Sequence, residues 1–98
     1  MPRYIVLGNF TDEGARNVRD LPRLRDETNR QLEAAGIKIQ RFYTLGQYDV
    51  VAIIEAPSDE AMATASLSAS GQGHVRVTTL KAFTEEEFYK MIEALPAS

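Results

Sequence analysis

The amino-acid sequence predicts a single α+β domain built on a four-stranded antiparallel sheet. Three observations predict this class. Four short segments are rich in β-branched and aromatic residues and alternate as strands do. Segments with helical spacing and capping residues lie between and after them. One pair of strand segments is joined by a short glycine-containing link, which is typical of an antiparallel hairpin.

The first part of the chain predicts a strand followed by a divided helix. Residues 3–10 are dense in β-formers and predict the first strand, after which Thr11 is a good N-cap. Residues 12–35 have a helical pattern that Pro22 divides, because proline suits the first turn of a helix and not its interior. Gly36 predicts the C-terminal cap. The apolar face of this helix holds Leu21, Leu24, Thr28, Leu32 and Ala35.

The middle of the chain predicts a hairpin and a second helix. Residues 37–44 and 49–55 predict the second and third strands, which the short link joins. The second helix has Ser58 or Asp59 as its N-cap, and Gly71-Gln72-Gly73 ends it. A phosphate-binding role for these glycines is disfavoured, because they follow a helix, whereas phosphate loops precede one.

The last part of the chain completes the sheet and adds a final helix. Residues 74–81 predict the fourth strand, and Thr84-Glu85-Glu86-Glu87 is a capping box that opens a helix to about Ala94. The order is therefore β-α-β-β-α-β-α, and its first six elements have the ferredoxin-like arrangement. Strands 3–10 and 49–55 are apolar on both faces and the other two are more polar. The first and third strands are therefore expected at the centre of the sheet, with the second and fourth at its edges.

This arrangement predicts self-association. The two crossover helices can cover only one face of the sheet, and the other face still presents large apolar side chains. At about 25 cal/mol per Å², burying several hundred Å² of apolar surface contributes roughly 10 kcal/mol before the entropy of association is subtracted. We therefore expect a homodimer in which two sheets pack about 10 Å apart. The alternative is that the final helix covers part of that face.

Composition excludes several classes of protein. The net charge of −3 resides in the last helix, where Glu85, Glu86, Glu87 and Glu93 outnumber Lys90. No basic stripe follows a phosphate backbone, so no nucleic-acid partner is expected. The chain has no cysteine and one histidine, so neither a metal site nor a cofactor is expected. No apolar run is long enough for a membrane span, and no signal peptide is recognised, which favours a cytoplasmic protein without a membrane partner.

The hairpin link and its flanking strands resemble a known family. The run Tyr43-Thr44-Leu45-Gly46-Gln47-Tyr48-Asp49-Val50-Val51 resembles the GYD domain family, named for that glycine, tyrosine and aspartate, and residues 11–18 and 75–84 look similar to it as well. The resemblance covers nearly the whole chain, residues 1–98, as one domain. It implies a ferredoxin-like subunit of the dimeric α+β barrel type, and it implies no activity. Such barrels include cofactor-independent monooxygenases, isomerases, haem enzymes and regulatory ligand-binding domains, among which fold alone does not choose.

The hairpin link holds the first candidate site. On a structural interpretation, Gly46 has a positive backbone dihedral, Asp49 accepts hydrogen bonds from loop amides, and the Tyr48 ring packs while its hydroxyl finds a partner. On a functional interpretation, Tyr48 and Asp49 line a ligand cleft, where a hydroxyl orients the substrate and a desolvated carboxylate acts as a base. Turn chemistry alone explains such residues, so the structural interpretation is favoured for Gly46 and Asp49. His74 is either an acid/base or haem-binding candidate or an exposed residue at a strand end.

The second helix suggests where a ligand would lie. It is rich in Ala and Ser, and such small side chains either let a helix pack closely on a sheet or leave room for a cavity. Tyr4, Asn9, Phe42 and Tyr43 are candidates for its walls. The candidate ligand-binding residues are Tyr48, Asp49, His74, Tyr43 and Asn9. The sequence thus favours a non-enzymatic or weakly catalytic homo-oligomer with a small-molecule cleft; the alternatives are a cofactor-independent oxygenase or isomerase and a purely structural dimerisation module.

Overall fold

The computed structural model describes residues 1–97 and contains the elements that the sequence predicts, in the same order. The strands are β1 (Arg3–Phe10), β2 (Lys38–Tyr43), β3 (Val50–Glu55) and β4 (Val75–Ala82). The helices are α1 (Asp12–Arg16), a 3-10 turn η1 (Val18–Asp20), α2 (Leu21–Ala34), α3 (Asp59–Gly71) and α4 (Glu85–Glu93). Within residues 1–97, no helix has the length and apolar character needed to cross a bilayer.

The four strands form one antiparallel sheet in the order β2-β3-β1-β4. The apolar strands β1 and β3 are central and the more polar strands are the edges, as the sequence predicts. Ile5 of β1 pairs with Ile53 on one side and with Leu80 on the other. Because side chains alternate along a strand, these three residues share one face of the sheet, and Tyr4, Ile54 and Lys81 share the opposite face.

The helix boundaries have local causes that the sequence already carries. The Thr11 hydroxyl accepts a hydrogen bond from the Gly14 amide and begins α1, and Pro22 lies in the first turn of α2. Ser58 caps α3 through the Ala61 amide. Thr84 and Glu87 form the predicted capping box of α4, and Gly36 ends the α2 region with a φ of 75°.

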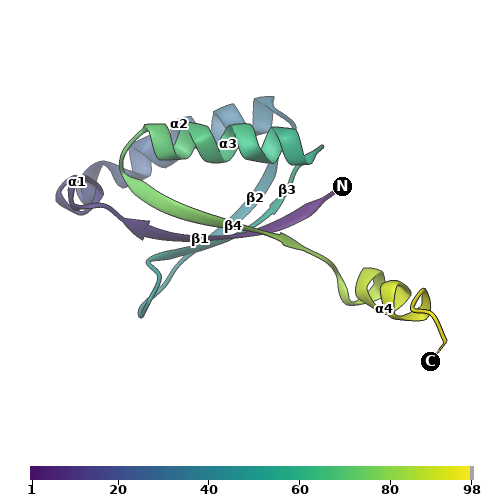
Figure 1. The fold of residues 1–98 in the computed structure, drawn as a ribbon. Coiled ribbons are helices and arrows are strands. Elements are labelled where there is room, and N and C mark those ends of the chain that lie inside the picture. Colours follow the sequence, from purple (N-terminus) through teal and green to yellow (C-terminus); the bar gives the residue numbers. More distant parts are fainter. Residues whose placement is uncertain (98) are drawn as a thin grey trace.

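Helices α2 and α3 lie on one face of the sheet (Figure 1), which defines two layers. The core lies between these layers and is built mainly from the central strands and α3. Its buried residues are Tyr4, Val6, Ile37, Ala52, Ile54, Ala56 and Met62. Helix α2 buries none of its residues fully, and only its partly buried Leu32 packs against this core. The helical layer is therefore incompletely filled beneath α2.

The opposite face of the sheet, here called the open face, is apolar. Ile5, Leu7 and Val51 are half-buried along its centre. Phe42 and Leu80 flank them and are 48% and 47% exposed. No helix of residues 1–97 lies over these side chains (Figure 1).

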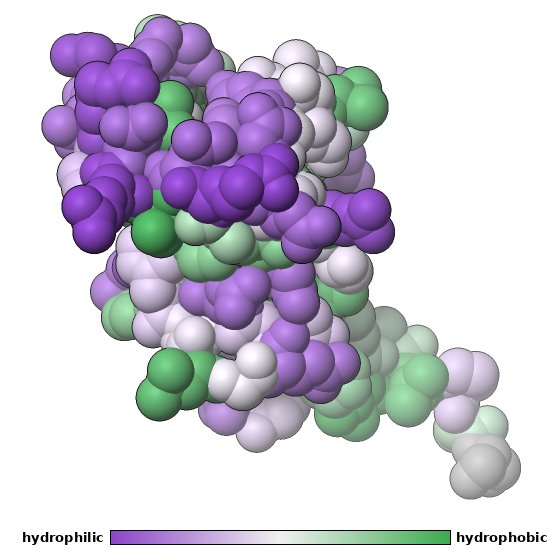
Figure 2. Space-filling view, turned by 90° about the vertical axis from the view of Figure 1, so that its left-hand side faces the viewer, coloured by the Kyte–Doolittle hydropathy of each residue, from purple (hydrophilic) through white to green (hydrophobic). Residues whose placement is uncertain are grey.

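Helix α4 projects beyond the end of β4 instead of folding back onto the sheet (Figure 1). The alternative that this helix covers the open face of its own chain is therefore wrong. The radius of gyration is 15.7 Å, against about 13 Å for a compact domain of this length. The apolar residues of α4 and its C-terminal end are exposed, namely Phe88, Met91, Ile92 and Leu95. Figure 2 shows hydrophilic side chains over the helical layer and hydrophobic ones on the distant arm that carries α4.

Candidate functional site

The hairpin between β2 and β3 is held to the end of β1 by its own signature residues. The Asp49 carboxylate accepts a hydrogen bond from the Phe10 amide at 2.9 Å, and the Asp49 amide donates to the Gly8 carbonyl at 2.9 Å. The Asn9 side chain donates to the Gln47 carbonyl at 2.9 Å. Gly46 has a φ of 108°, as expected of a turn glycine. The expectation that Asp49 binds amides of its own loop is wrong: its partner is the last residue of the neighbouring strand.

Tyr48 contributes its backbone to the same turn. Its carbonyl accepts a hydrogen bond from the Thr44 hydroxyl at 2.6 Å, while its side chain is half-buried. No hydrogen bond to the Tyr48 hydroxyl is found within residues 1–97, and this residue lines neither of the two cavities described below. The hairpin turn is thus built mainly by backbone and carboxylate contacts.

The first cavity lies between the sheet and the two helices of the covered face. Its volume is about 250 Å³, and strands and helices both line it. Small side chains of α3 form part of its wall, including Ala65, Ser66 and Ala69. The aliphatic side chains of β1 and β3 form an apolar floor, including Val6, Val50 and Ile54. The Ala- and Ser-rich composition of α3 therefore accompanies open space between helix and sheet.

This cavity has a cationic side. Arg25 of α2 and Arg41 of β2 line it on that side, His74 lines it near the opposite edge of the sheet, just before β4, and none of its lining residues is acidic. Burial lowers the pKa of the Arg41 guanidinium from its ordinary value, and the neighbouring Arg25 charge acts in the same direction. Arg25 Nε and His74 Nδ1 are buried and have no hydrogen-bond partner within residues 1–97. A buried polar atom without a partner costs about 1–3 kcal/mol.

The predicted ligand-binding residues separate into two groups. Tyr43 and His74 line the cavity. Asn9, Tyr48 and Asp49 do not line it: Asn9 and Asp49 hold the hairpin turn to β1, and Tyr48 accepts a hydrogen bond within the turn. Asn9 therefore makes no cavity wall.

The other two expected wall residues also lie elsewhere. Phe42 lies on the open face of the sheet, because it alternates with the inward-pointing Arg41 and Tyr43. Tyr4 lines a different groove, between α3 and β4. The strand register determines on which face of the sheet each of these side chains lies.

Sequence reasoning missed the two arginines of the cavity, although each carried a signal. Arg25 lies three residues before Thr28 and seven before Leu32, so it shares the apolar face of α2. Arg41 alternates with Ile39 and Tyr43, so it shares the inward face of β2. In both elements, an arginine lies on a face that is otherwise largely apolar, and this pattern indicated a cationic site between the helix and the sheet.

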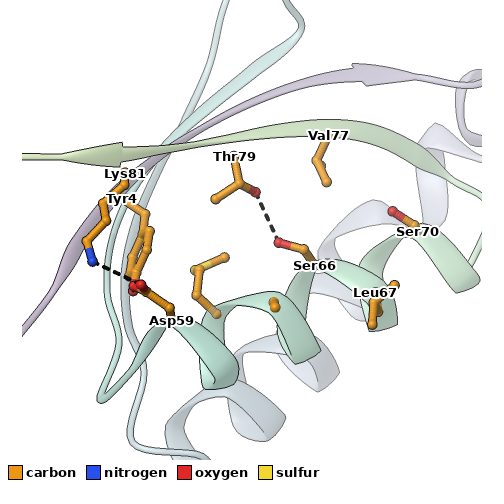
Figure 3. A pocket seen from close by; sticks show the side chains of 10 residues that line it. Tyr4, Asp59, Ser66, Leu67, Ser70, Val77, Thr79 and Lys81 are labelled. Carbon is orange, nitrogen blue, oxygen red and sulfur yellow. Dashed lines mark hydrogen bonds and ion pairs between the residues drawn. The ribbon is translucent and has the colours of Figure 1, made fainter.

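A second, more open groove lies between α3 and β4 (Figure 3), with a volume of about 540 Å³. At one end the Tyr4 hydroxyl donates a hydrogen bond to Asp59, which also forms an ion pair with Lys81 at 3.0 Å. Burial, followed by the Asp59 hydrogen bond, raises the pKa of Tyr4 to about 12. Ser66 and Thr79 are hydrogen-bonded at 3.0 Å across the middle of the groove. These polar groups satisfy one another, unlike those of the first cavity.

The Asp59 carboxylate should make stability depend on pH. The Tyr4 hydrogen bond and the Lys81 amine hold the pKa of this carboxyl below its ordinary value. A depressed pKa contributes stability above the unfolded-state pKa, and that contribution is lost as the pH falls through the folded-state pKa. We expect Asp59→Asn to be less stable than the parent at pH 7, with a difference that shrinks below about pH 4. Urea unfolding at pH 7 and pH 3 measures this, with the exposed Asp26→Asn as control; a pH-independent difference would contradict it.

The fold and its cavities define a small α+β domain with an internal cationic pocket and an unpartnered apolar sheet face. The chain belongs to the GYD domain family, whose profile matches residues 4–92, as the hairpin signature predicts. A similar protein is the glutamine synthetase and cystathionine beta-lyase binding protein of Thermus thermophilus. It is 37% identical to this chain over 84 residues, which cover 84% of this chain and 88% of the relative.

Proposed function

We propose that the protein is a non-catalytic homodimeric binding protein that docks onto other proteins and holds a small molecule in its cavity. The observation that carries this proposal is the pair of apolar surfaces without a partner, the open face and α4. Contiguous apolar surface of this kind usually marks a site of association. The occupant of the open face is a second copy of the chain.

The sheet topology supports the dimeric part of the proposal. The strand order β2-β3-β1-β4, with helices on one face only, is compatible with a ferredoxin-like subunit. Two such subunits packed open face against open face would form a dimeric α+β barrel. Ile5, Leu7 and Val51 would then lie at the centre of the interface, where apolar side chains are fully removed from water.

The position of helix α4 also supports a second copy of the chain as the occupant of the open face. The apolar side chains of α4 are exposed to solvent, and the helix projects beyond its own sheet. In a two-fold dimer the same surfaces meet twice, so α4 of each copy can pack beside the sheet of the other. Phe88 and Ile92, one helical turn apart, would supply the contact.

The relative supports the docking part of the proposal. Its name describes a protein that binds two enzymes, and it matches this chain over most of both lengths. The alternative of a cofactor-independent oxygenase or isomerase is less well supported. Its proposed residues, Tyr48, Asp49 and His74, do not share the cavity, and the Asp49 carboxylate is engaged by the Phe10 amide.

The dimer is tested by light scattering coupled to size-exclusion chromatography at about 20 µM protein, with a dissociation constant well below that concentration expected. Leu80→Glu on the open face and Ile92→Glu on α4 should each raise the dimer dissociation constant at least about 100-fold, because each would bury an unpaired charge. The matched control is Leu67→Glu on α3, which is 74% exposed in the helical layer and should remain dimeric. A monomeric parent protein, or a monomeric Leu67→Glu variant, would contradict the proposed interface.

Docking is tested separately by calorimetric titration against glutamine synthetase and cystathionine beta-lyase from the organism that encodes the chain. Saturable binding of either enzyme supports the docking role. If neither binds at about 50 µM while the protein is dimeric, the docking role is wrong and the dimer stands, since that limit corresponds to about 6 kcal/mol of binding free energy.

A further inference from the structure

We propose that the cavity between α2, α3 and the sheet binds a small organic carboxylate, with its anionic end at Arg25 and Arg41 and its hydrocarbon body on the apolar floor. This inference rests on the proposed small-molecule cleft and specifies the chemistry of its ligand. It does not depend on the dimer or on the docking of enzymes.

The charge of the cavity points to an anion. Its lining includes the guanidinium groups of Arg25 and Arg41 and no carboxylate. Within residues 1–97, neither Arg25 nor Arg41 forms an ion pair; the ion pairs there join Arg3 with Glu55, Lys81 with Asp59, and Lys90 with Glu86. Like charges in a partly buried site repel, and an anion between them reverses the sign of the interaction.

The hydrogen-bonding groups point the same way. Arg41 donates to the Asn29 side chain at 3.1 Å, which leaves most of its donors free for a ligand. Arg25 Nε is buried without a partner within residues 1–97. The planar fork of arginine matches the two oxygens of a carboxylate.

The rest of the cavity limits the ligand to a small, largely apolar molecule. Beyond the cationic side, the strands and α3 present Val6, Ile54 and Met62. The volume of about 250 Å³ holds roughly eight non-hydrogen atoms at the volume per molecule of liquid water, about 30 Å³. A six-carbon fatty acid or a simple aromatic acid has this size. Bare phosphate would leave the apolar floor without a partner.

The test is isothermal titration calorimetry on the full chain with hexanoate, benzoate, their neutral amides and inorganic phosphate. Hexanoate or benzoate is expected to bind with a dissociation constant below about 1 mM, and the matching amide at least tenfold more weakly. The two acids separate an aliphatic from an aromatic ligand. Equal binding of acid and amide would overturn the carboxylate inference and leave the cleft standing. Binding of phosphate as tight as that of either acid would also overturn it, and binding of no probe up to about 10 mM would contradict the cleft itself.

Three variants locate the binding. Arg25→Gln and Arg41→Gln should each raise the dissociation constant of the bound acid at least about tenfold, because each removes a charge-assisted hydrogen bond. The control is Arg30→Gln, which changes an exposed arginine of α2 that does not line the cavity and should leave binding unchanged. Circular dichroism checks that each variant is folded. If a variant does not fold, the comparison of acid with amide on the parent protein still decides whether the cavity prefers a carboxylate. Equal losses in all three variants would place the acid outside the cavity.

Discussion

Replacing Gly14 with alanine is expected to destabilise the protein by about 3 kcal/mol, the upper part of the usual range for an overpacked site. A Cβ atom at this position would lie 2.0 Å from the backbone carbonyl oxygen of His74, and that oxygen cannot move as a side chain can. The same carbonyl accepts a hydrogen bond from the Thr11 amide at 3.0 Å, and the Thr11 hydroxyl donates to the Gly73 carbonyl at 2.6 Å. Separating α1 from β4 therefore weakens these contacts together. Thermal unfolding at fixed protein concentration should show a midpoint lowered by roughly 12–24 °C.

The matched control is Gly71→Ala in α3. An added Cβ there meets no atom within 4 Å, and the residue has a helical conformation. Alanine at a compatible helical position stabilises by about 0.4–1 kcal/mol. If Gly14→Ala unfolds at the same temperature as the parent protein, the close approach of α1 to β4 is wrong.

Asp49→Ala is the second substitution with a large expected effect, a loss of about 2 kcal/mol in the free energy of unfolding. The carboxylate accepts the Phe10 amide at 2.9 Å, and alanine leaves that partly buried amide without a partner. Because this amide lies at the end of a central strand, the link between β1 and the hairpin should loosen first. Urea unfolding followed by circular dichroism gives the magnitude, and hydrogen exchange of the Phe10 amide gives the location.

Asp49→Asn separates the hydrogen bond from the charge. Asparagine retains a carbonyl acceptor in the same position, so this variant should lose less than half as much stability as Asp49→Ala. Neither variant should change the affinity for hexanoate, because Asp49 does not line the cavity. A stable Asp49→Ala variant that no longer bound hexanoate would assign this carboxylate to the ligand after all.

Much of the fold was predictable because its signals are local. Thr11, Ser58 and Thr84 each cap the helix that follows them, and their hydroxyls identify these starts in the sequence. The apolar character of both faces of β1 and β3 placed these strands at the centre of the sheet, which is correct.

The candidate site was less predictable, because its membership depends on register and on contacts between distant segments. Tyr43 and Phe42 are adjacent in the sequence, yet only Tyr43 reaches the cavity, since successive side chains point to opposite faces. The partner of Asp49 is Phe10, 39 positions away, which no local pattern identifies. Arg25 was visible as one residue of an apolar helix face, but only the fold brings it into the same cavity as Arg41.

The central position of β1 has a consequence for biosynthesis. This strand is made before the other three, yet its two neighbours are β3 and β4, so Arg3 pairs with Glu55 and with Ala82. On the ribosome the earliest strand emerges without either partner, and the sheet closes only after β4 has been translated. Pairing between such distant segments is slow compared with local helix formation. An apolar strand that has not yet paired with its neighbours is prone to aggregate. The polypeptide must therefore complete the synthesis of its whole sheet before this central strand has both of its neighbours.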